Sequence, residues 1–165
     1  MLRLQQVLSG HIITDNGDLI ELKSKRLDAL LEIVQETEGK ILIWSRFRND
    51  IQRIYKTLED NFPGQSATYY GSTPDDERQE IVTKFQDPEA TTVIYYANDF
   101  NLETRIQSED RCHRIGQKNP VTYIDLITEN TIDEAIVRAL RDKIDLGAKV
   151  LGEEAREWLT IKPTK

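Results

Sequence analysis

Cysteine and histidine are scarce in this sequence of 165 residues. Cys112 is the single cysteine, so no disulfide can form within the chain, and we expect a reducing, intracellular location. The two histidines are His11 and His113, and no Cys-x-x-Cys pair occurs. Because zinc sites need several such ligands at close spacing, we expect no metal site.

Long apolar runs and an excess of positive charge are also missing. No run approaches the roughly 20 apolar residues that cross a bilayer, and Met1–Gln6 lacks the apolar core of a secretory signal. We therefore expect no membrane partner. Acidic residues outnumber basic ones 29 to 22, a net charge of −7. Bulk charge therefore cannot hold nucleic acid, and any such binding needs a local basic patch.

Short apolar runs alternate with segments of helical periodicity. Strands are predicted at 41–44, 67–70, 92–96 and 121–127, and helices at 24–39, 51–62, 73–85, 102–115 and from 131 onward. Strand and helix alternate four times, which predicts an α/β fold with a parallel sheet and helices on both faces. Chemistry in such sheets gathers at the carboxyl ends of the strands.

The chain divides into three predicted parts. Residues 1–23 form a lead-in segment, in which Asn16-Gly17 lies between two apolar pairs and predicts a hairpin turn. Residues 24–145 form the α/β lobe, and residues 146–165 form a C-terminal helical extension.

The densest group of polar residues runs from Gln107 to Gln117. On a helix, Gln107, Arg111 and Arg114 share one face, and two guanidinium groups on one face suit a polyanion. Between 105 and 118, four basic side chains accompany two acidic ones, a local excess of positive charge. The alternative is a solvated helix face with ion pairs such as Asp110–Arg114 or Glu109–His113.

This run reads Q-S-E-D-R-C-H-R-I-G-Q and resembles motif VI of the Swi/Snf family of superfamily-two helicase-like ATPases. Other segments resemble the same family in the same order: Leu2–Gln6, Ile41–Phe47 (motif IV), Gly71–Thr73 with Arg78 and Phe85, and Asn130–Glu134. The resemblance spans about residues 1–145. It implies a RecA-like three-layer sandwich, the C-terminal lobe of a DNA-stimulated ATPase that moves along double-stranded DNA.

The resemblance also implies roles for single residues. Arg111 and Arg114 would be arginine fingers that reach ATP, Gln107 would orient the nucleotide, and Asp110 would hold an arginine. The candidate contacts to the DNA backbone are Ser45, Arg46, Gly71, Ser72 and Thr73. Helix capping by Ser72-Thr73 and an ordinary surface role for Arg46 are the alternatives.

The implied partners are double-stranded DNA and an N-terminal RecA-like lobe, with a monomeric chain in the cytoplasm of a bacterial or phage host. The sequence departs from the family in having no P-loop and no D-E-x-H motif. We therefore expect ATP and most of the Mg²⁺ contacts to require the other lobe, and the chain alone to be inactive.

Motif V is a second departure. Ala90 runs directly into Thr91, where the family has a further strand and a glycine-rich loop. A natural loss, an engineered deletion and residues left out of the sequence are all open explanations.

Two other functions fit parts of the sequence. A cysteine phosphatase would need C-x₅-R, but position 118 is Lys, so Cys112 is expected to be a buried or half-buried filler. A stand-alone, non-catalytic lobe that binds DNA or protein remains the alternative. It would bind DNA independently of nucleotide, whereas a translocase lobe would bind weakly without its partner lobe.

Overall fold

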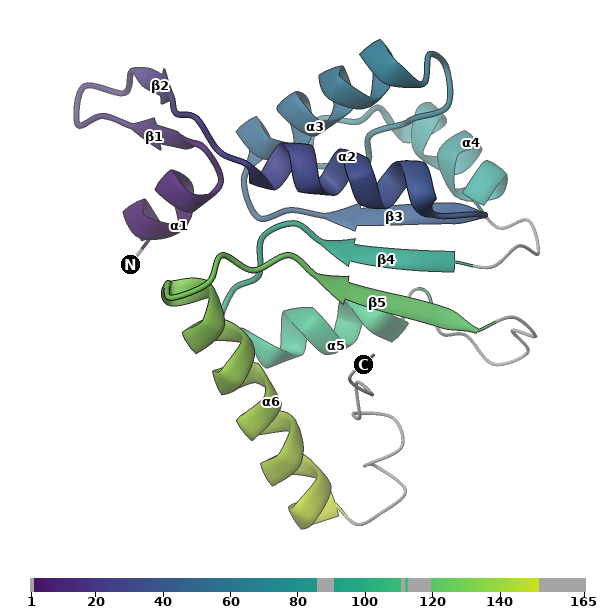
Figure 1. Ribbon diagram of the computed structural model, residues 1–165. Helices are drawn as coiled ribbons and strands as arrows, with labels where there is room; N and C mark the ends of the chain where they lie inside the picture. The colour runs from purple at the N-terminus through teal and green to yellow at the C-terminus, as the bar shows by residue number, and fades with distance from the viewer. Residues whose placement is uncertain (1, 86–90, 111, 113–119, 152–165) are drawn as a thin grey trace.

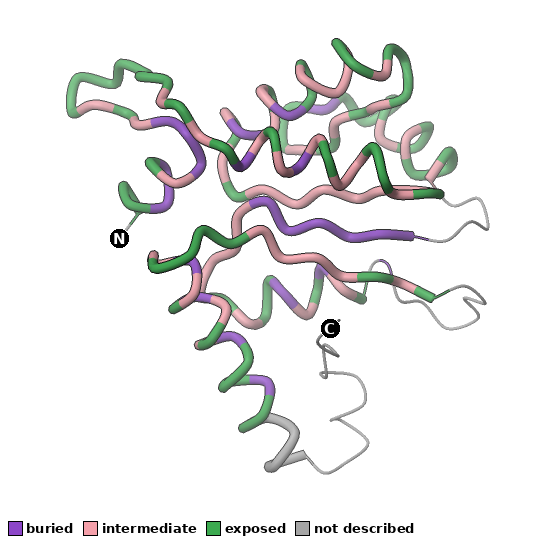
Figure 2. The backbone as a smooth tube through the Cα atoms, viewed as in Figure 1, coloured by how far each residue is buried: buried purple, intermediate pink, exposed green. Residues whose placement is uncertain are grey.

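A three-stranded parallel sheet forms the centre of the molecule (Figure 1). The computed structural model describes residues 2–85, 91–110, 112 and 120–151, with side chains as far as residue 146. The strands are β3 (Lys40–Trp44), β4 (Thr91–Tyr95) and β5 (Val121–Asp125), in the order β3-β4-β5. Every residue of β4 is buried (Figure 2), as expected for a central strand made of an apolar run.

Helices cover both faces of this sheet, which confirms the predicted α/β sandwich. On one face, Leu30 of α2 (Arg26–Glu36) and Ile54 of α3 (Arg48–Asn61) form a core with Ile94. On the other face, beside α5 (Leu102–Asp110), Val93 and Cys112 belong to a second cluster. The expectation that Cys112 is buried is therefore confirmed.

Two further helices lie at the margins of the sheet. In α6 (Ile132–Leu151), Ile136, Leu140 and Ile144 are buried at intervals of four residues, which is the spacing of one helix face. In contrast, α4 (Asp75–Phe85) has no buried residue. Among the described helices, none is both long and apolar enough to cross a membrane.

The predicted strand at 67–70 is wrong. The N–H of Tyr70 donates to the Thr73 hydroxyl, and Thr73 N donates to the carbonyl of Tyr70, both within one turn. The Thr73 hydroxyl donates in turn to Thr68 O. A β-prone run becomes a strand only when a neighbouring backbone pairs with it, and here the hydrogen bonds are local.

The lead-in segment consists of α1 (Leu2–Leu8), β1 (His11–Ile13) and β2 (Leu19–Glu21), and the predicted hairpin is confirmed. Gly17 supplies the positive φ of +88° at its turn. This segment lies near the carboxyl ends of the three parallel strands (Figure 1).

Some predictions fall outside the described residues. The described part of the predicted helix at 102–115 ends at Asp110, and Cys112 follows in a turn closed onto Glu109 O. Positions 113–115, the junction before Thr91 and the helical stretch at 155–159 are not described.

Candidate functional site

The two candidate arginine fingers, Arg111 and Arg114, lie outside the described residues. The helix before them, α5, starts at the carboxyl edge of the sheet and runs back toward the amino ends of the strands (Figure 1). Gln107 and Asp110 are exposed on it, and Gln107 Nε2 donates to Glu103 Oε1 at 3.1 Å. The described start of motif VI therefore lies at the end of a helix that runs away from the carboxyl edge of the sheet.

Arg105 is not available to a phosphate group, although it contributes to the positive charge counted in the sequence. It is buried, and its guanidinium donates to Glu109 Oε1 and Asp125 Oδ1, each at 2.5 Å. The guanidinium carbon also lies 3.4 Å from the centre of the Tyr95 ring. Burial raises the pKa of Glu109, and Arg105 opposes that rise. Arg105 thus fixes α5 to β4 and β5.

The candidate DNA residues that follow β3 already have partners within the protein. Ser45 Oγ donates to Asp50 Oδ2 at 2.9 Å. Arg46 is exposed, and its Nη1 donates to Gln5 Oε1 at 3.0 Å. Its guanidinium also lies 6.0 Å from the Phe47 ring centre. Arg46 is therefore held on one side and open to solvent on the other.

The second candidate segment is the turn at 70–73. Gly71 and Ser72 are exposed, whereas Thr73 is buried. The Thr73 hydroxyl donates to Thr68 O, and the Thr73 N–H donates to Tyr70 O. Both donors of Thr73 are therefore used inside the turn. Gly71 and Ser72 remain as the accessible candidates, and Thr73 shapes the turn that presents them.

Arg48 is a residue that the sequence reasoning missed. Its Nη2 lies 3.7 Å from the position that a side-chain carbon would occupy at Gly71. Arg48 is exposed at the start of α3, so it brings the loop after β3 next to the Gly71 turn. The available signal was the R-F-R spacing of Arg46 and Arg48, which places two guanidinium groups in one short loop.

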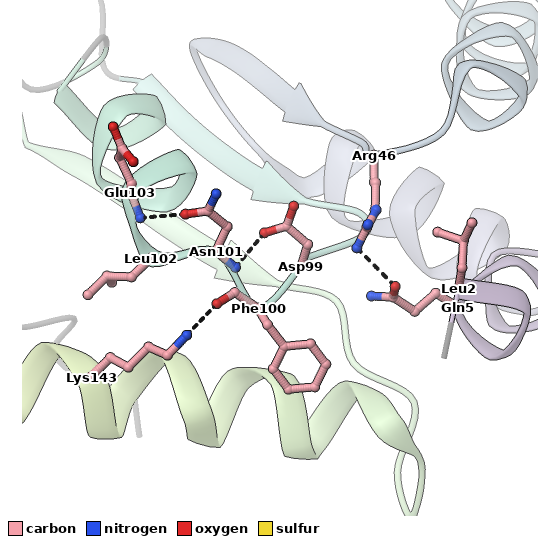
Figure 3. A pocket seen from close by; sticks show the side chains of 9 residues that line it. All are labelled: Leu2, Gln5, Arg46, Asp99, Phe100, Asn101, Leu102, Glu103 and Lys143. Atoms are coloured by element: carbon pink, nitrogen blue, oxygen red, sulfur yellow. Dashed lines mark hydrogen bonds between the residues drawn. The ribbon is translucent and has the colours of Figure 1, made fainter.

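An open depression of about 710 Å³ lies beside Arg46 (Figure 3). It is lined by Leu2, Gln5, Arg46, Asp99, Phe100, Asn101, Leu102, Glu103 and Lys143. The Lys143 ammonium donates to Phe100 O at 2.6 Å, and Asp99 accepts from Asn101 N at 2.8 Å. Because two cations and two carboxylates share this wall, the depression is not a uniform anion site.

No group of metal-ligating side chains gathers within the ranges that the structure describes. Of the two histidines, His11 is fully buried beside Asp50, and His113 falls in the part that is not described.

Comparisons with known proteins identify the kind of lobe to which the chain is similar. The family described as "Helicase conserved C-terminal domain" matches residues 23–89. The human protein "SWI/SNF-related matrix-associated actin-dependent regulator of chromatin subfamily A member 1" is 32% identical over 165 residues, covering 86% of this chain and 15% of its own length. The yeast protein "Transcription regulatory protein SNF2" is 30% identical, covering 78% of this chain and 9% of its own length.

A solved structure shows the same fold. The C-terminal part of the Fun30 ATPase domain has a TM-score of 0.60 and 25% identity, covering 72% of this chain and 45% of that chain. The chain thus corresponds to a small fraction of the length of the relatives that it resembles.

Proposed function

Because this chain belongs to the Swi/Snf family of superfamily-two helicase-like ATPases, as a C-terminal RecA-like lobe, we propose that it is the second lobe of a DNA-stimulated ATPase that moves along double-stranded DNA. Arg111 and Arg114 act as arginine fingers that contact the phosphates of ATP. The ATP and its Mg²⁺ are bound mainly by a P-loop lobe. Gln107 orients the nucleotide, and Asp110 holds one of the two arginines.

The observation that supports this proposal is the nearly complete motif VI signature over residues 107–117, which begins on α5 in a lobe of the matching fold. An arginine that enters the site from a second lobe stabilises the charge that develops on the phosphoryl group. Charge-assisted hydrogen bonds from a guanidinium fit that geometry, and the group stays protonated at working pH.

The DNA-facing surface is the loop after β3 together with the Gly71 turn. Arg46, Arg48 and Ser72 are exposed there, and Arg48 Nη2 lies 3.7 Å from the position of a side-chain carbon at Gly71. Contacts of this kind position a phosphate backbone without reading bases. The net charge of −7 is consistent with weak binding by this lobe alone, so DNA is held firmly only when both lobes close on it.

Arg111→Ala and Arg114→Ala test the arginine fingers in a two-lobe enzyme made by fusing this chain to a P-loop lobe of the family. We expect each substitution to lower DNA-stimulated turnover by about 10³-fold or more, because the developing charge loses its partner. Phosphate release at saturating ATP measures the effect.

Arg138→Ala is the matched control, since Arg138 is an exposed arginine on α6. It should leave turnover within about twofold of the parent, as surface changes usually do. Unchanged turnover in Arg111→Ala and Arg114→Ala would exclude the finger role. A fused parent that binds duplex DNA but never hydrolyses ATP would instead support the non-catalytic module.

A further inference from the structure

Gln5, in the lead-in segment, contacts the candidate DNA loop directly. Its side chain is only 5% exposed, its Nε2 donates to Asn98 O at 2.9 Å, and its Oε1 accepts from Arg46 Nη1 at 3.0 Å. Reversing the amide would turn its NH₂ group toward the guanidinium and lose both bonds. The backbone carbonyl of Asn98 therefore fixes the amide in the orientation that accepts from Arg46.

The residues on either side of Arg46 are also tied to the lead-in segment. His11 Nδ1 lies 3.1 Å from Asp50 Oδ1, with both side chains fully buried, and Asp50 Oδ2 accepts from Ser45 Oγ. The His11 and Phe47 rings meet edge to face, with centroids 5.3 Å apart. Ser45, Arg46 and Phe47 are thus each held by the lead-in segment, directly or through Asp50.

The backbone of the lead-in segment is itself clamped to α3. Arg53 Nη1 donates to Ser9 O at 3.1 Å and to Gly10 O at 2.8 Å. Gly10 has φ +86°, and a Cβ there would lie 2.8 Å from Ser24 Cβ. Only glycine fits such a close approach at positive φ. The backbone that follows α1 is therefore held against α3 by Arg53 and by the close packing at Gly10.

We propose that Gln5 is a positioning residue that orients the Arg46 guanidinium toward a phosphate of the DNA backbone, so that the lead-in segment sets the affinity of the loop after β3 for duplex DNA. This inference rests on the proposed function, since it assumes that Arg46 contacts DNA. Gln5 itself is buried and reaches the DNA only through Arg46. Immobilising a long side chain before binding removes an entropic cost that corresponds to about 2- to 10-fold in affinity.

A double-mutant cycle on the 165-residue chain tests the proposal. The probe is a fluorescent 30-bp duplex in anisotropy titrations at several low salt concentrations. Arg46→Ala should weaken binding and reduce the salt slope by about 1, because one phosphate contact is lost. Gln5→Met, which keeps the length and burial of the side chain, should weaken binding about 2- to 10-fold with the slope unchanged. In the Arg46→Ala background, Gln5→Met should have no further effect.

Gln6→Met is the matched control, because Gln6 is also buried in α1 but is not the acceptor of Arg46. Thermal unfolding of each variant separates loss of fold from loss of orientation. Arg46→Ala without any effect on binding would overturn the DNA-facing role and this inference together. Arg46→Ala with an effect and Gln5→Met without one would overturn only the positioning role. Equal losses from Gln5→Met in both backgrounds would also overturn it.

Discussion

At the scale of single residues, burial decides which charged and polar groups can serve a site. Arg105 looks like part of a basic cluster in the sequence, yet Glu109 and Asp125 bind it inside the fold. Arg46 and Arg48 have their guanidinium groups at the surface. A buried guanidinium must be paired, because an unpaired charge in the interior costs several kcal/mol, roughly 3–5 when one partner is removed.

Tyr96 contributes to the pH dependence of stability at alkaline pH, as do Tyr95 and Tyr123, whose pKa burial also raises. Burial raises the pKa of Tyr96 to about 12, with the nearby Asp50 carboxylate adding to the effect, against 10.0 for an unperturbed tyrosine. The folded state thus keeps a proton that the unfolded chain loses, so stability falls as pH rises from about 10 through about 12. Two pKa units correspond to a loss of about 3 kcal/mol at most.

Tyr96→Phe removes that proton and should make the alkaline fall in the free energy of unfolding smaller, while the contributions of Tyr95 and Tyr123 remain. Urea titrations at pH 8, 10 and 11 measure the difference between the parent and the variant. Tyr55→Phe is the exposed control and should follow the parent across the same range. Parallel curves for the parent and Tyr96→Phe would show that Tyr96 does not account for the fall.

At the scale of elements, the segment 67–73 shows how a strand pattern becomes a turn. The run A-T-Y-Y has strong β propensity, but within the described ranges no strand pairs with it. Instead, the Thr73 hydroxyl accepts from the Tyr70 N–H within the same turn. Arg78 Nη2 also donates to Tyr70 O at 3.4 Å and to Gly71 O at 3.3 Å. This turn is what presents Gly71 and Ser72 beside Arg48.

Thr73→Val tests the turn without changing the shape of the side chain. We expect it to lower the free energy of unfolding by about 1–3 kcal/mol, because the partly buried Tyr70 N–H and Thr68 carbonyl lose their partner. Urea unfolding measures it. Thr83→Val is the control on α4, where the hydroxyl is exposed and bonds to Gln79 O, and should cost no more than about 0.5 kcal/mol. Equal stabilities of the two variants would contradict a structural role for Thr73.

At the scale of the whole molecule, the loop after β3 and the described start of motif VI lie on different parts of the lobe. The loop after β3 and the lead-in segment lie at the carboxyl edge, and Arg48 brings the Gly71 turn next to that loop, whereas α5 runs from that edge toward the amino ends of the strands (Figure 1). The loop after β3 and the described start of motif VI are joined through the sheet, to which the buried Arg105 contacts fix α5.

The chain alone should show no ATP turnover above background, with or without duplex DNA. Its sequence has neither a P-loop nor a D-E-x-H motif, so the groups that cradle the phosphates and Mg²⁺ must come from another lobe. Steady-state phosphate release measures this, and the fusion to a P-loop lobe serves as the positive control. Clear turnover by the isolated chain would contradict the two-lobe proposal.

The sequence by itself determined the α/β class, the Asn16-Gly17 hairpin, three of the four predicted parallel strands and the family, because these depend on local periodicity, turn chemistry and a specific motif. The tertiary structure alone decided that 67–70 is not a strand and that Arg105 is paired with two carboxylates. It also decided that Gln5 accepts a hydrogen bond from Arg46, 41 positions along the chain. Those outcomes depend on which distant groups share a buried space, and a buried polar group takes whichever partner the packing brings to it.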